Sequence, residues 1–216
     1  MGQVRSICCY CGVGCGVIIE TKRDRITGVK GDPEHPANFG RLCTKGSTLH
    51  LTAQPDGRAL YPEMRSARDQ PRQRVAWTEA LDFVAERFAC IIREHGPDAV
   101  AFYISGQLLT EDYYVFNKLS KGLIGTNNVD TNSRLCMSSA VAGYKATLGA
   151  DSVPACYEDI DHAECILIAG ANTAYAHPVL FRRIEDARAK NPDLKLVVVD
   201  PRATDTAAAA DLHLPL

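Results

Sequence analysis

Four cysteines near the N-terminus constrain this chain of 216 residues more than any other feature of its sequence. Three lie on one short glycine-bearing loop and the fourth follows much later, giving the pattern C-x2-C-x3-C-x27-C at Cys8, Cys11, Cys15 and Cys43. Four thiolates suit a cubane iron–sulfur cluster. Tetrahedral zinc is the alternative, although structural zinc sites usually use two separated pairs of closely spaced cysteines. Cys9 has the wrong spacing to replace Cys8 and is expected to be a spectator.

Composition excludes several classes of protein. The chain has 9 cysteines, an odd number that cannot all pair in disulfides, and residues 1–7 hold neither a long apolar stretch nor a twin-arginine signal. These features favour the cytoplasm and metal ligation. A net charge of −2 offers no cationic excess for nucleic acid. No apolar run approaches the roughly 20 residues that span a bilayer, so no membrane partner is expected.

The segment after the cysteine loop predicts a β-hairpin. Two β-rich runs, Val17 to Thr21 and Ile26 to Lys30, flank a charged turn at residues 22–25. The hairpin would bring Cys43 back beside the loop. Breakers follow from Gly31 onward, and the first domain is expected to end at residue 57.

From residue 58 the pattern changes to alternating helices and strands. Thr78 is expected to cap a helix that runs to about His95, and a second helix is expected from Thr110 to about residues 122–125. Apolar strands are expected at residues 99–104, 165–169 and 196–199, with a helix over 179–190 between the last two. Strands that are apolar throughout predict a parallel sheet covered on both faces. The apolar end at residues 212–216 has the pattern of an interrupted strand.

The ends of the three predicted strands carry candidate ligand contacts, because open parallel sheets bind ligands beyond the carboxyl ends of their strands. The segments are Ser105-Gly106-Gln107, Gly170-Ala171-Asn172-Thr173 and Asp200-Pro201-Arg202. None is a G-x-G-x-x-G fingerprint, so a nicotinamide dinucleotide is not indicated. The amides can donate and accept, and the Asp200 carboxylate can accept two N–H groups from a guanine-like edge. The alternative is that these residues simply form the turns that end the strands.

Cys136 differs from the other scattered cysteines. It follows Arg134 and precedes an apolar helical stripe, and both the arginine and the helix N-terminus favour a thiolate there. Such a thiolate could be a nucleophile or a soft metal ligand. Cys90, Cys156 and Cys165 are expected to be buried apolar residues.

Taken together, these motifs resemble the molybdopterin-dependent oxidoreductases and, among them, the catalytic subunits of cytoplasmic assimilatory nitrate reductases. The segments that carry the resemblance run in order along essentially the whole chain: residues 8–15, 42–46, 105–107, 136–141, 170–172 and 177–178. The resemblance implies a [4Fe–4S] cluster on Cys8, Cys11, Cys15 and Cys43, and a protein thiolate from Cys136 on molybdenum. It implies that Lys45 lies between the cluster and the pterin, as a catalytic and cofactor-contacting residue. It also implies pterin or nucleotide contacts by Gly106, Gln107, Asn172, His177, Asp200 and Arg202.

The fold implied is α/β: a small iron–sulfur domain with a β-hairpin over residues 1–57, then a Rossmann-like parallel sheet over 58–216, truncated at the C-terminus. The second region would comprise an α/β segment over 58–135 and the incomplete start of a dinucleotide-binding-like segment over 136–216. The cofactors implied are the [4Fe–4S] cluster and molybdenum bis(molybdopterin guanine dinucleotide).

The activity implied is reduction of nitrate to nitrite by oxygen-atom transfer, with electrons from ferredoxin, flavodoxin or a nicotinamide-dependent flavin reductase. Met137 follows Cys136, whereas formate dehydrogenases of this superfamily typically carry histidine there. A formate dehydrogenase-like enzyme and a stand-alone iron–sulfur electron-transfer module are the alternatives, and an incompletely folded piece without activity is a third. Family members are much longer, so the isolated 216 residues are expected to be a fragment that does not reduce nitrate.

Overall fold

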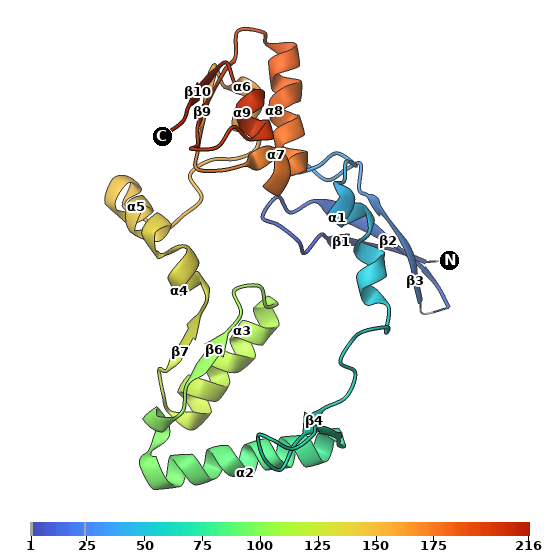
Figure 1. Cartoon of the computed structure of the whole chain (residues 1–216), viewed down its shortest axis with the longest axis vertical. Coiled ribbons are helices and arrows are strands. Elements are labelled where there is room, and N and C mark those ends of the chain that lie inside the picture. The colour runs from blue at the N-terminus through green and yellow to red at the C-terminus, as the bar shows by residue number, and fades with distance from the viewer. Residues whose placement is uncertain (1, 24) are drawn as a thin grey trace. The chain divides into compact units, whose positions relative to one another are not determined.

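The chain forms two compact units in the computed structural model, which describes residues 2–23 and 25–216 (Figure 1). Met1 and Asp24, the latter in the turn predicted between two strands, lie outside the described residues. The first unit combines Met1–Asp56 with Val153–Leu216, and the second is Gly57–Ser152. The N-terminal cysteines therefore share a unit with residues 153–216.

The N-terminal sheet has three antiparallel strands in the order β1-β2-β3: β1 (Gly2–Ile7), β2 (Gly16–Lys22) and β3 (Arg25–Gly31). The predicted hairpin is confirmed as β2 and β3. Strand β1 was not predicted, and its pairing of Ile7 with Gly16 makes the cysteine loop the connection between β1 and β2. A short helix α1 (Thr44–Ser47) and a 3-10 turn η1 (Leu49–Ala53) complete this part.

The other part of the first unit contains a parallel sheet in the order β10-β9-β8: β8 (Cys165–Ala169), β9 (Lys195–Val199) and β10 (Leu212–Leu214). The helices around it are α6 (Glu158–His162), α7 (Thr173–Ala176), α8 (Pro178–Lys190) and α9 (Asp205–Ala208). The strands and long helix predicted from apolar runs are confirmed here within one or two residues.

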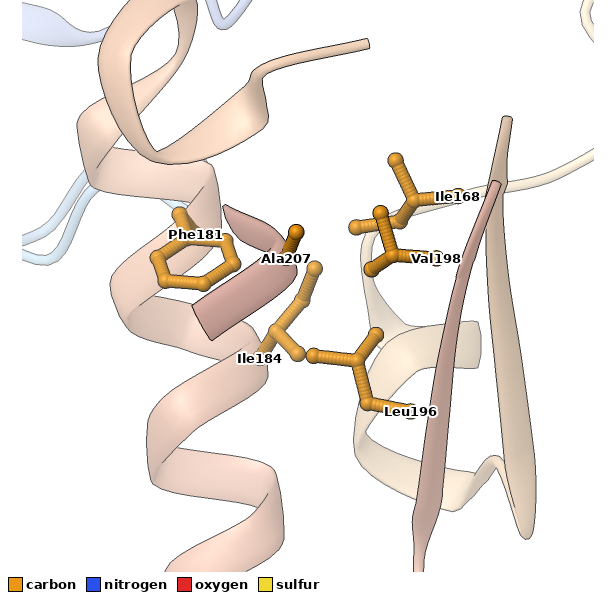
Figure 2. Close-up of a cluster of buried hydrophobic side chains, with 6 residues drawn as sticks. All are labelled: Ile168, Phe181, Ile184, Leu196, Val198 and Ala207. Carbon is orange, nitrogen blue, oxygen red and sulfur yellow. The ribbon is translucent and has the colours of Figure 1, made fainter. Parts of the chain in front are cut away.

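The core of this sheet lies on one face only. Figure 2 shows Ile168 of β8 and Leu196 and Val198 of β9 pointing toward α8 and α9, whose side chains in this cluster are Phe181, Ile184 and Ala207. The expectation of a sheet covered on both faces is wrong for β8, because alternate residues of this strand point away from the helices. Leu167 is 65% exposed, and Cys165 on the same face is exposed rather than buried as predicted. Cys156 is exposed too, and Cys90 is half-buried.

The second unit contains the remaining elements. It contains two two-stranded sheets. Strands β4 (Glu63–Met64) and β5 (Gln73–Arg74) pair antiparallel, and β6 (Phe102–Ile104) and β7 (Val129–Thr131) pair parallel. Its helical segments are α2 (Trp77–His95), η2 (Pro97–Ala99), α3 (Thr110–Asn117), η3 (Lys118–Ile124), α4 (Ser133–Cys136) and α5 (Ser138–Leu148).

Two local predictions in the second unit are wrong. Thr78 does not cap α2: the N-cap residue is Ala76, whose extended backbone precedes the helix, and no side chain caps it. The strand predicted from residue 99 begins only at Phe102, because Pro97 starts a 3-10 turn that takes up Ala99. The predicted α/β class is confirmed, although the parallel strands of the described residues lie in two small sheets rather than one.

Candidate functional site

The four N-terminal motif cysteines line one cavity in the first unit. Its other walls come from Tyr10, Val13, Leu42, Gly46, Pro178 and Val179. Cys8 and Cys15 are buried, Cys11 and Cys43 are half-buried, and Cys9 is exposed and outside this lining. The structure thus brings together the four thiols that spacing alone had grouped.

Backbone hydrogen bonds fold the cysteine loop tightly. The Cys8 N–H donates to the Cys15 carbonyl at 2.9 Å, which closes the base of the loop where β1 and β2 begin to pair. At its tip, the Gly14 N–H donates to the Cys11 carbonyl at 3.4 Å. Gly14 has a φ of +68°, a backbone conformation that glycine adopts without a steric cost.

Asn38 joins the cysteine loop to the segment that leads to Cys43. Its side chain is fully buried and makes three hydrogen bonds. Its Oδ1 accepts from the Gly16 N–H at 2.8 Å, and its Nδ2 donates to the Gly16 carbonyl at 3.0 Å and the Arg41 carbonyl at 2.8 Å. Because Gly16 follows Cys15 and Arg41 precedes Cys43 by two residues, this one amide sets the separation of the two cysteine segments.

Burial and mutual proximity oppose negative charge on the thiols. Burial, reinforced by the neighbouring thiols of Cys8, Cys11 and Cys43, raises the pKa of Cys15 to about 11. Burial also raises the pKa of Cys8, partly offset by a hydrogen bond from the Tyr10 backbone. Four thiolates can therefore coexist in this cavity when bound metal supplies compensating positive charge.

The donor set fits a multi-atom cluster. A cubane takes one thiolate on each of its four irons, and the four cysteines that line this cavity supply that number of thiolates. Over residues 2–23 and 25–216, no three Cys, His, Asp or Glu side chains converge on a position for one metal ion. Lys45 lies in α1, two residues after Cys43, with an exposed side chain.

Tyr157 is a contact residue of the cysteine loop that the sequence did not reveal. Its hydroxyl lies 2.8 Å from the Val13 carbonyl oxygen and 3.2 Å from that of Gly12. Burial, followed by the charges of Cys15 and Cys11, raises the pKa of Tyr157, so the phenol keeps its proton and donates. Neither Tyr157 nor Asn38 belongs to a pattern that spacing or periodicity could have singled out.

In the second unit, the structure brings Gly106 close to the Cys136 segment. Strands β6 and β7 pair in parallel, with Ile104 opposite Thr131, so the residues after both strands meet at one edge. There the Asn132 Oδ1 accepts from the Gly106 N–H at 2.5 Å, and the Asn132 Nδ2 lies 3.9 Å from the Cys136 sulfur. Cys136 ends α4 and is exposed. Gln107 follows, its N–H donating to the Ser105 hydroxyl at 3.1 Å.

The other predicted contacts lie in the first unit, after β8 and β9. The Asn172 Oδ1 accepts from the Thr206 hydroxyl at 2.9 Å, and His177 is the N-cap residue of α8. Asp200 is buried, and its Oδ1 accepts from the Arg202 N–H at 2.8 Å. Arg202 itself is exposed. Asp200 thus performs the turn-forming role that the sequence left open as an alternative.

No helix within residues 2–23 and 25–216 combines the length and the apolar character that crossing a membrane requires.

Comparison with known proteins extends over the whole chain. The model of the molybdopterin oxidoreductase Fe4S4 domain matches residues 1–54, and that of the molybdopterin oxidoreductase family matches residues 58–216. The chain is 53% identical over 216 residues to a nitrate reductase of Klebsiella oxytoca, covering 100% of the chain and 24% of that protein. It is 47% identical over 211 residues to a periplasmic nitrate reductase of Desulfovibrio desulfuricans, covering 98% of the chain and 28% of that protein.

Among solved structures, acetylene hydratase from Pelobacter acetylenicus matches with a TM-score of 0.81 and 27% identity, over 98% of this chain and 29% of that one. The chain spans about a quarter of the length of the curated relatives it matches. The two family models indicate a molybdopterin cofactor and a [4Fe–4S] cluster. The cavity that the four cysteines share agrees with a [4Fe–4S] cluster. The chain therefore belongs to the molybdopterin oxidoreductase family.

Proposed function

We propose that a protein containing this chain reduces nitrate to nitrite, and that this chain supplies the electron-transfer cluster and the protein thiolate of the molybdenum centre. The observation that carries the proposal is the single cavity lined by Cys8, Cys11, Cys15 and Cys43, in a chain that aligns from end to end with nitrate reductases. When bound, molybdenum bis(molybdopterin guanine dinucleotide) supplies oxygen-atom transfer chemistry.

The roles of this chain's own residues follow from their chemistry. The four cysteines hold the cluster that delivers single electrons. Cys136 offers an exposed sulfur, a soft donor suited to a metal already held by dithiolene sulfurs. Lys45 places a cation two residues from a cluster ligand and is proposed to contact the pterin. Backbone and amide groups after the strands are proposed to contact the pterin or its nucleotides: Gly106, Gln107, Asn172, His177, Asp200 and Arg202.

The proposal includes the domain assignment, with the cluster domain over residues 1–57 and the molybdopterin-binding α/β region over 58–216. The family matches at 1–54 and 58–216 support this division along the sequence. It also includes an assimilatory role, a cytoplasmic location, and ferredoxin, flavodoxin or a flavin reductase as donor. Fractionation of the native cells tests the location, since a related protein is named periplasmic. Nitrate reduction assayed with each donor in turn tests the last point.

Metal analysis of anaerobically purified chain tests the cluster. Iron with acid-labile sulfide in equal amounts is expected, and zinc alone would refute the assignment. Replacing Cys15 with serine should abolish iron binding, whereas Cys90→Ser is the matched control because Cys90 belongs to the second unit and does not line the cavity. The isolated 216 residues are expected to show no nitrate reduction with reduced methyl viologen.

Cys136→Ala in the full-length protein tests the molybdenum ligand. Nitrate turnover should be lost while the iron content stays at the wild-type level, because the cluster cysteines belong to the other unit. Cys90→Ala, in the same unit as Cys136, should leave turnover unchanged. Undiminished nitrate turnover in Cys136→Ala would refute the assignment of Cys136 as the molybdenum ligand. A purified protein that contains iron, lacks molybdenum and still transfers electrons would instead favour a stand-alone electron-transfer module.

A further inference from the structure

At the tip of the cysteine loop, a Cβ atom added at Gly12 or Gly14 would meet no atom within 4 Å, so neither position packs against a neighbour there. Val13 between them is buried in an apolar cluster with Cys8, Cys15 and Val179, and its carbonyl oxygen accepts the hydrogen bond from Tyr157 at 2.8 Å. A contact from a residue more than 140 positions away thus ties down a loop segment that carries Cys11 on one side and Cys15 on the other.

Tyr157 is itself held firmly. It is the N-cap residue of α6, and Asp161 in that helix forms a two-pronged ion pair with Arg183 of α8. The Arg183 guanidinium donates to the two Asp161 carboxylate oxygens at 3.2 and 2.5 Å, and to the Pro36 carbonyl at 3.2 Å. Arg183 is 9% exposed. Helix α6, which begins after Tyr157, is therefore fixed to α8 by this ion pair. The same arginine connects α8 to the segment before Cys43.

Hydrogen bonds and solvent exposure around an iron–sulfur cluster set its reduction potential. Groups that orient the ligands of a metal site without touching the metal tune it as well. A loop that loses its tie to Tyr157 would sample other positions of Cys11 and Cys15 and admit water to the cavity. Water favours the reduced cluster, because reduction adds negative charge.

We propose that Tyr157 is a positioning residue that fixes the Cys11–Cys15 loop around the cluster. Through that loop, it lowers the cluster's reduction potential. This inference rests on the cluster assignment under the proposed function. It adds a contribution from the C-terminal part of the chain to a cluster whose ligands all lie within the first 43 residues.

The test is Tyr157→Phe in the full-length protein, purified anaerobically, with the cluster's midpoint potential measured by redox titration and its reduced state by electron paramagnetic resonance. The variant should keep its iron. Its ratio of reduced to oxidised cluster at a fixed potential should rise about tenfold, equivalent to about 59 mV for one electron. Iron release to a chelator should accelerate by a similar factor. Tyr114→Phe, at a tyrosine that is 66% exposed on α3, is the control and should change neither quantity.

The possible failures are distinguishable. A wild-type protein without iron would overturn the cluster assignment and this inference together. A Tyr157→Phe protein with a wild-type potential and spectrum but a lower unfolding temperature would show a purely structural role and overturn the inference alone. If Tyr157→Phe does not fold, Asp161→Asn loosens the anchor and leaves the phenol in place. A smaller shift in the same direction supports the inference, and an unchanged potential overturns it.

Discussion

Asn38→Ala is expected to destabilise the first unit by about 3 kcal/mol. The side chain is 1% exposed and makes three hydrogen bonds, at 2.8, 3.0 and 2.8 Å. Each is worth about 1 kcal/mol, and the two bonds to Gly16 are buried, so water cannot readily replace the amide there. For a protein of this size, the loss corresponds to a fall of roughly 10 °C in Tm.

The assay is hydrogen–deuterium exchange of the cluster-free chain, read by peptide. Peptides from β2 and β3 should lose protection in Asn38→Ala, while peptides from α2 in the second unit should not change. Urea unfolding followed by circular dichroism gives the free energy. Asn117→Ala is the control, because Asn117 makes one exposed hydrogen bond, to the Tyr113 carbonyl, that water can replace. The reasoning is refuted if Asn38→Ala loses no more stability than Asn117→Ala.

The remaining predictions concern stability, measured by urea unfolding of the cluster-free chain. Gly31→Ala should cost about 1–3 kcal/mol, because its Cβ would lie 2.0 Å from the Gly40 carbonyl oxygen. Gly143→Ala, in the open interior of α5, should instead stabilise by about 0.5–1 kcal/mol. Leu196→Ala should cost about 2–5 kcal/mol, whereas exposed Leu167→Ala should stay within about 0.5 kcal/mol; equal losses would contradict the one-sided core. The hydrogen bond from Arg183 lowers the pKa of Asp161, so this carboxylate's contribution is complete above its unfolded pKa of about 3.9 and is lost as pH falls through the lower folded value. Asp161→Asn should therefore flatten the acid side of the stability curve, and an unchanged slope between pH 2 and 5 would count against the ion pair.

The local hydrophobic pattern was sufficient to predict elements whose apolar side chains recur with a single period. The runs at 17–21 and 26–30 gave a hairpin, and the apolar runs around 165–169 and 196–199 gave parallel strands with α8 between them. The pattern failed to predict burial where the exposure of a side chain depends on which other elements pack against its own. Cys165 and Leu167 are apolar and in a strand, yet they are exposed because α8 and α9 cover only the opposite face. Strand β1 was missed because all six of its residues are exposed, so no buried face marks it.

The sequence by itself determined the family, because residue type and spacing are written directly in the chain. The spacing of the four N-terminal cysteines and the separate thiol at Cys136 also carry the proposals for the cluster and the molybdenum ligand. Only the tertiary structure decided which distant residues share a unit. It joined residues 1–56 to 153–216, and so placed Tyr157 against the cysteine loop and Arg183 within hydrogen-bond distance of the Pro36 carbonyl. It also gave Asn38 its bridging position between Gly16 and Arg41. These contacts depend on the packing of segments far apart in the chain, for which neither spacing nor periodicity carries a signal.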